Sequence, residues 1–149
     1  MPTLEELRRE LDRDELDYPA LAVRLGRAAL RGLHSLVAED EPRIASKAVY
    51  LAALIGGPAA GDVVSVAARS QHGAVRVSAA AALEKLPPDQ GVGIAGHLMS
   101  DPDVGVRARA AKSAANVADL RMTELLSTLS DNDPHAQVRA LAARLITSG

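Results

Sequence analysis

The sequence lacks cysteine, phenylalanine and tryptophan, and its only aromatic residues are Tyr18 and Tyr50. Without cysteine, the chain has no disulfides, no Cys-ligated zinc, no iron–sulfur cluster and no thiol nucleophile. The shortage of aromatic residues argues against a β-sandwich or barrel, whereas the abundant alanine lets helices approach one another closely. Helix is therefore the expected secondary structure.

Long apolar runs are missing as well. Residues 1–17 alternate charges and lack the apolar core of a signal peptide. The longest apolar stretch, Ala48 to Gly61, is shorter than the roughly 20 residues that a membrane helix needs. With 48% apolar and 24% charged residues, the chain has the balance of a folded globular protein. We expect a single cytoplasmic domain over residues 1–149 with no membrane partner.

A repeat dominates the second half of the chain. Valine followed by arginine occurs at positions 75, 106 and 138, so the period is about 31 residues. Stepping back by one more period reaches Ile44. Small apolar residues follow each start by four and five positions, and another apolar residue follows by eight. The spacing of four and eight marks one face of a helix. Each repeat therefore contains a helix that begins near its Val-Arg pair.

A second helix is predicted between these starts. Val63, Ile94 and Leu125 recur with the same period and are each followed by further apolar residues. Turn residues separate the helices, as in Asp101-Pro102-Asp103, where Asp can cap a helix and Pro is tolerated in its first turn. The unit is therefore helix, turn, helix, turn, and such units stack side by side.

The segments DPDVGVRARAA and DPHAQVRALAA resemble the short HEAT-like repeats common in bacterial proteins, some of which are bilin lyases and isomerases. The resemblance covers roughly residues 30–146 and implies an all-α, right-handed solenoid of antiparallel helix pairs. We expect N-terminal cap helices over residues 1–29 and about four repeats over residues 30–149. Ala45 stands where the repeat expects arginine, as is common in a divergent terminal unit.

The arginines of the Val-Arg pairs form a regular row: Arg76, Arg107 and Arg139. A step of about 100° per residue places each beside the buried stripe, at the seam with the neighbouring repeat. There they can reach aspartates of the loops, such as Asp101 and Asp133. We therefore predict a structural ladder between repeats rather than a ligand site.

A second row lies far around the same helices from the buried stripe. The resemblance places these helices on the concave surface of the solenoid, so we predict that the row binds a partner. Its members are Lys47, Tyr50, Ser78, Lys85, Arg109, Lys112, Asn116 and Arg144. The alternative is that these side chains are ordinary solvated residues.

Charge is unevenly distributed along the chain. The net charge is −2, yet residues 1–41 hold ten acidic residues and six arginines, whereas the helices that follow the Val-Arg starts are basic. A basic concave face favours an acidic protein partner. Phosphate-backbone binding is the alternative, although a nucleic-acid surface without aromatic side chains has little with which to stack bases.

Catalytic and metal motifs are not recognisable. HEAT-like hydroxylases bind iron through His-Glu pairs, but His34, His72, His97 and His135 are followed by Ser, Gly, Leu and Ala. No serine lies in a Gly-x-Ser-x-Gly elbow. We therefore predict a protein without catalytic residues, metal or cofactor that acts as a non-enzymatic scaffold or adaptor. The remaining alternative is a lyase-like or regulatory subunit of an enzyme complex.

The last predicted helix, residues 138–146, is followed by no polar capping helix. The end of a solenoid without a cap leaves surface on which another repeat can stack. We therefore predict that this end docks to a partner or to a second copy of the chain.

Overall fold

The computed structural model describes residues 1–148, and in this part of the chain it contains α-helices, two short 3-10 helices and no strand. The elements are α1 (Leu4–Leu11), α2 (Tyr18–Leu25), η1 (Arg27–Ala29), α3 (Leu30–Ala38), α4 (Pro42–Ile55), α5 (Pro58–Ala68), α6 (Gly73–Ala82), η2 (Leu83–Lys85), α7 (Pro88–Leu98), α8 (Val104–Ala115), α9 (Leu120–Asn132) and α10 (Ala136–Ser148).

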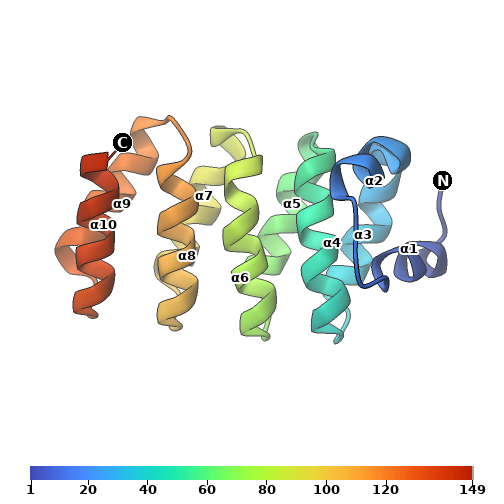
Figure 1. The fold of residues 1–149 in the computed structure, drawn as a ribbon, viewed down its shortest axis with the longest axis horizontal. Helices are drawn as coiled ribbons and strands as arrows, with labels where there is room; N and C mark the ends of the chain where they lie inside the picture. Colours follow the sequence, from blue (N-terminus) through green and yellow to red (C-terminus); the bar gives the residue numbers. More distant parts are fainter. Residues whose placement is uncertain (149) are drawn as a thin grey trace.

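The helices form two layers. The helices α4, α6, α8 and α10, which follow the repeat starts, stand side by side in one layer, and α3, α5, α7 and α9 form the layer behind them (Figure 1). Each helix packs against its partner in the other layer and against the next repeat. The predicted all-helical solenoid of short repeats is confirmed.

Alanine allows this close stacking. The repeat positions four residues after each start are Ala48, Ala79, Ala110 and Ala142, and all four are fully buried. Leucine, valine and isoleucine fill the wider spaces between the layers, as Leu33, Val64 and Leu98 do. Because an alanine side chain adds little width, neighbouring helices can approach closely without leaving voids.

Local capping fixes where the helices begin. Asp103 accepts a hydrogen bond from the backbone N–H of Gly105 at 2.8 Å, and Asp119 accepts one from Arg121 at the same distance. Between α4 and α5 the backbone reverses through Gly56 and Gly57, whose φ angles of 75° and 89° favour glycine. The turns therefore lie where the sequence predicts them.

The N-terminal segment, residues 1–25, folds over one end of the solenoid. Helix α1 packs on α3 and buries Leu7 and Leu11. The approach is close because α3 carries Gly32 at the contact, where an added Cβ would clash with the Leu7 side chain. Helix α2 instead packs on α4, so the N-terminal segment also covers part of the layer formed by α4, α6, α8 and α10.

Candidate protein-interaction surface

The arginines of the repeats hold neighbouring units together. Arg76 donates from Nε to Asp101 at 2.9 Å and from Nη1 to the Ser70 carbonyl at 2.8 Å. Arg107 repeats both contacts one unit later, with Asp133 at 2.7 Å and the Asp101 carbonyl at 2.9 Å. We call these arginine–aspartate contacts the ladder. The predicted structural role of Arg76 and Arg107 is confirmed.

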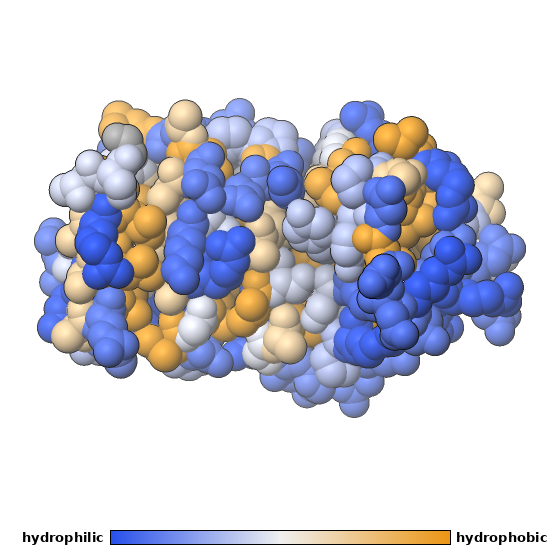
Figure 2. Space-filling view, viewed as in Figure 1, coloured by the Kyte–Doolittle hydropathy of each residue, from blue (hydrophilic) through white to orange (hydrophobic). Residues whose placement is uncertain are grey.

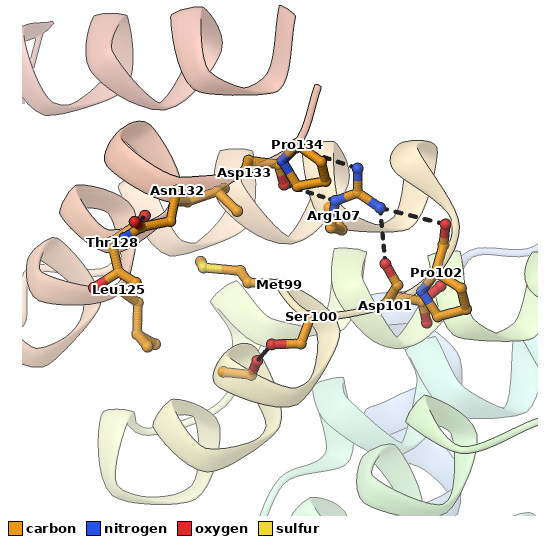
Figure 3. Close-up of a pocket in the computed structure, with 12 residues that line it drawn as sticks. Met99, Ser100, Asp101, Pro102, Arg107, Leu125, Thr128, Asn132, Asp133 and Pro134 are labelled. Carbon is orange, nitrogen blue, oxygen red and sulfur yellow. Dashed lines mark hydrogen bonds and ion pairs between the residues drawn. The ribbon is translucent and has the colours of Figure 1, made fainter. Parts of the chain in front are cut away.

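The rung between Arg107 and Asp133 is buried. The two side chains are 10% and 1% exposed, and the Arg107 guanidinium lies between Asp133 and the carbonyls of Asp101 and Pro102 (Figure 3). Burial by itself raises the pKa of Asp133, but the hydrogen bonds from Arg107 and from the His135 backbone hold that pKa below its ordinary value. Asp133 is therefore an anion held by its partners.

One rung of the ladder is missing, at the divergent first repeat. Ala45 stands in the arginine position and Ser70 in the aspartate position, so both ends of the contact have changed together. The first and second repeats are joined instead by His72 and Asp40, because His72 Nε2 lies 2.5 Å from Asp40 Oδ1.

The predicted partner-binding row does not form one open surface. At its start, the Lys47 ammonium donates to the carbonyls of Leu11 and Arg13, at 2.9 and 2.7 Å. Tyr50 packs edge-to-face on Tyr18 of α2, with the ring centroids 5.0 Å apart. The side chains of Lys47 and Tyr50 are therefore already in contact with the N-terminal segment.

Acidic side chains of the N-terminal segment meet the basic end of α4. Arg43 donates to Asp12 Oδ1 at 2.5 Å and to the Asp12 carbonyl at 2.8 Å, and Asp14 lies 3.9 Å away. The sequence shows that residues 1–41 are acidic and α4 is basic, but not that the two lie together.

The middle of the predicted row, apart from Lys85, is engaged within the solenoid. Ser78 donates to the Ser46 carbonyl at 2.6 Å. Glu84 of η2 accepts a hydrogen bond from Asn116 at 2.7 Å and lies 3.9 Å from the Arg109 guanidinium. Lys85, also on η2, is exposed and has no ionic partner among the described residues.

The C-terminal part of the row is open. Lys112 of α8 and Arg144 of α10 are both exposed, and neither side chain has a hydrogen-bonding or ionic partner in residues 1–148. Both line one groove of about 360 Å³, together with the apolar side chains of Val104, Val138 and Leu141. We call it the α8–α10 groove.

The surface view shows the same arrangement. Hydrophilic side chains follow α8 and α10 in separate columns with apolar surface between them, and a wider hydrophilic area covers the N-terminal segment (Figure 2). Val104 is 40% exposed at the start of α8 and lines the same groove as Lys112. Sequence reasoning selected Lys112 and Arg144 but missed Val104, whose position directly after the capping Asp103 was its only signal in the sequence.

A second cavity, of about 500 Å³, opens between α7 and α9. Its walls are mainly apolar and include Met99, Leu125 and Leu129, while the rung between Arg107 and Asp133 closes one side (Figure 3). The polar groups of that rung already form hydrogen bonds with one another, so they have little hydrogen-bonding capacity left for a ligand. The cavity follows from the packing of the two repeats.

The four histidines lie far apart in the fold. His34 lies on α3 and His97 on α7, whereas His72 and His135 lie in the turns before α6 and α10. Within residues 1–148, no three His, Asp or Glu side chains form a group that could hold a metal ion. No helix in the same range is both long and apolar enough to cross a membrane.

Comparison with known proteins places this architecture in a family. The family model for HEAT repeats matches residues 62–147, more than half of the chain. The chain belongs to the HEAT-repeat family. A search of curated proteins finds no matching relative.

Solved structures show the same fold. Twenty-two chains match, among them a chain from the structure of the complex of CpcE and CpcF of phycocyanin lyase from Nostoc sp. PCC7120. That match covers 95% of this chain and 96% of the other, with 18% sequence identity and a TM-score of 0.74. It shows that the helices of the two proteins follow the same path.

This comparison corrects one prediction. The sequence indicated that the protein is not an enzyme, because it has no recognisable catalytic or metal motif. The matched chain comes from a lyase, so this fold occurs in an enzyme over nearly its whole length. The prediction was therefore wrong, because a missing motif does not separate scaffolds from enzyme subunits within this fold.

Proposed function

We propose that the protein is a subunit of a larger assembly and binds an acidic segment of a partner protein in the α8–α10 groove. The observation that carries this proposal is the groove itself. Lys112 and Arg144 face it without ionic partners among the described residues, and Val104, Val138 and Leu141 contribute apolar side chains to the same groove. An acidic segment with one apolar face complements both features.

The chain's own N-terminal segment is an internal example of such binding. At the other end of the same layer, Asp12 pairs with Arg43, and Lys47 binds two backbone carbonyls at the end of α1 and just after it. A segment rich in carboxylates thus already lies against the basic helices. The α8–α10 groove offers comparable charges at the end that the N-terminal segment does not reach.

Charge reversal tests the proposal. The purified chain, immobilised on a resin, is compared with a Lys112→Glu, Arg144→Glu double variant in an extract of the source organism. Arg31→Glu on α3 is the matched control, because Arg31 is exposed on the opposite layer. Proteins retained by the wild type and the control, lost by the double variant and released as salt rises support the proposal. Equal retention by all three chains contradicts it.

Nucleic acid is a separate outcome of this experiment. A mobility-shift titration with duplex DNA should show no binding at physiological salt. Binding that falls steeply with salt and disappears in the double variant would instead assign the groove to phosphate contacts.

A lyase-like subunit is the second candidate, and the match to the phycocyanin lyase complex over 95% of the chain favours it. In that case the groove holds a protein substrate or a second subunit, and the chemistry is carried out by the complex. The visible absorption spectrum of phycocyanin is recorded before and after addition of the chain together with its retained partner. A changed spectrum supports this candidate, and an unchanged one counts against it.

A further inference from the structure

A polar groove of about 320 Å³ lies between α5 and α7, in the layer that does not contain α8 and α10 (Figure 1). Its walls include Ser65 and Arg69 from α5 and Gly93 and His97 from α7. We call it the α5–α7 groove. The side chains of Ser65, Arg69 and His97 have no hydrogen-bonding or ionic partner within residues 1–148. Three hydrogen-bond donors of this groove are therefore unused.

The neighbouring repeat provides an internal comparison. The cavity between α7 and α9 occupies the corresponding place one repeat later. A shift of 31 residues replaces the three donors by side chains without charge, namely Gly96, Ser100 and Thr128, which line that cavity. The cationic side chains are thus particular to the α5–α7 groove and are not a general property of the repeat.

The α5–α7 groove also lacks an acidic side chain that both neighbouring repeats carry. Asp62 on α5 and Glu124 on α9 lie 31 residues before and after Gly93. Glycine inside a helix lowers stability, and a Cβ added at Gly93 would meet no atom within 4 Å. Packing therefore does not require glycine at this position. A carboxylate there would lie one turn from His97 and would oppose the binding of an anion.

One carboxylate does line the groove, that of Asp89 at the start of α7. It lies about 12 Å from His97 along the helix axis, at 1.5 Å per residue. Asp89 is also paired with Arg121, at 2.8 Å. It therefore leaves Arg69 and His97 without a counter-ion.

We propose that the α5–α7 groove binds the phosphate group of a small molecule, whose oxygens accept hydrogen bonds from Arg69, His97 and Ser65. A guanidinium matches two phosphate oxygens at once, and the imidazole and hydroxyl groups supply further donors. The volume suits a small molecule, and the absent side chain of Gly93 leaves room for the part that carries the phosphate. This groove and the α8–α10 groove share no lining residue, so the two proposals can fail independently.

The alternative is that Arg69 and His97 serve only the helices that carry them. Arg69 caps the C-terminal end of α5 and His97 lies in the last turn of α7, where the helix dipole favours cations. In that case both substitutions would lower the melting temperature, but the groove would bind no phosphate.

Nuclear magnetic resonance separates these two roles. The ¹⁵N-labelled chain is titrated at constant ionic strength with inorganic phosphate, with glycerol 3-phosphate and with glycerol. The amide signals of residues 65–69 and 93–97 should shift with both phosphate compounds and not with glycerol, while those of α3 stay unchanged. The absence of shifts, or equal shifts at exposed arginines throughout the chain, would overturn the proposal.

A variant that restores the acidic residue of the neighbouring repeats makes the test specific. Gly93→Glu should weaken the binding of glycerol 3-phosphate at least about tenfold. It should also raise the melting temperature, because glutamate is the better helix former, so lost binding cannot come from unfolding. Arg69→Gln should weaken binding to a similar extent. Arg31→Gln is the matched control, since Arg31 is exposed on α3 of the same layer. Unchanged affinity in Gly93→Glu, or an equal loss in Arg31→Gln, would refute the proposal.

Discussion

Replacing Arg107 by alanine gives the most direct test of the ladder. The change removes two hydrogen bonds to the Asp133 carboxylate, at 2.7 and 3.2 Å, and two to the backbone carbonyls of Asp101 and Pro102, at 2.9 and 3.3 Å. It also leaves the Asp133 side chain, only 1% exposed, without its counter-ion. The loss of stability therefore includes the cost of an unpaired buried charge as well as the lost contacts.

The magnitude follows from this burial. Removing one partner of a buried pair costs about 3–5 kcal/mol, whereas one hydrogen bond to a backbone carbonyl contributes about 1 kcal/mol. Arg139→Ala is the matched comparison, because Arg139 has the same carbonyl contact but no aspartate among the described residues. Arg107→Ala should therefore destabilise the chain by at least about 2 kcal/mol more than Arg139→Ala.

Urea denaturation at pH 7, followed by circular dichroism, measures both variants. Adding Asp133→Asn to Arg107→Ala should restore part of the loss, because the buried carboxylate then no longer needs a partner. Two results would contradict a buried ion pair between the repeats. Arg107→Ala and Arg139→Ala would lower the free energy of unfolding equally, or Asp133→Asn would lower it further when added to Arg107→Ala.

Three further predictions concern acid sensitivity, the N-terminal segment and the missing rung. Because the pKa of Asp133 lies below its ordinary value, its contribution is present above pH 4 and is lost as the pH falls through that lowered pKa. The gap in urea midpoint between the wild type and Asp133→Asn should therefore narrow from pH 7 to pH 3, and a constant gap would contradict this. Lys47→Met removes two hydrogen bonds that hold the end of α1, so the hydrogen-exchange rates of the amides in residues 4–11 should rise about tenfold. The rates in α8 should stay the same. Unchanged rates in α1 would argue against a role of Lys47 in holding this helix. Ala45→Arg with Ser70→Asp should install the absent rung. The gain in the free energy of unfolding of the double variant should therefore exceed the sum of the gains of the single variants by about 1–3 kcal/mol, whereas additive effects would show that no rung has formed.

The ladder also bears on how the repeats cooperate. In a solenoid each unit contacts only its neighbours, so stability depends on the interfaces between units. The rungs at Arg76 and Arg107 strengthen two successive interfaces in the C-terminal half. The interface of the first repeat relies instead on the contact between His72 and Asp40 and on packing.

The sequence by itself determined the helical solenoid, the repeat length and the roles of Arg76 and Arg107. These features come from short-range patterns that recur in every unit with a nearly constant period, so each copy reinforces the interpretation of the others. The turns could be predicted for the same reason, since capping aspartates and the Gly56-Gly57 pair act on backbone only a few residues away.

Only the tertiary structure decided which members of the predicted partner-binding row are open. Lys47 and Tyr50 are occupied by residues that are distant in the sequence, because α1 and α2 fold back over α4. Lys112 and Arg144 come from adjacent repeats and share a groove only because α8 and α10 stand side by side. A periodic pattern fixes the direction in which a side chain points along its own helix. What that side chain meets there depends on how distant segments pack.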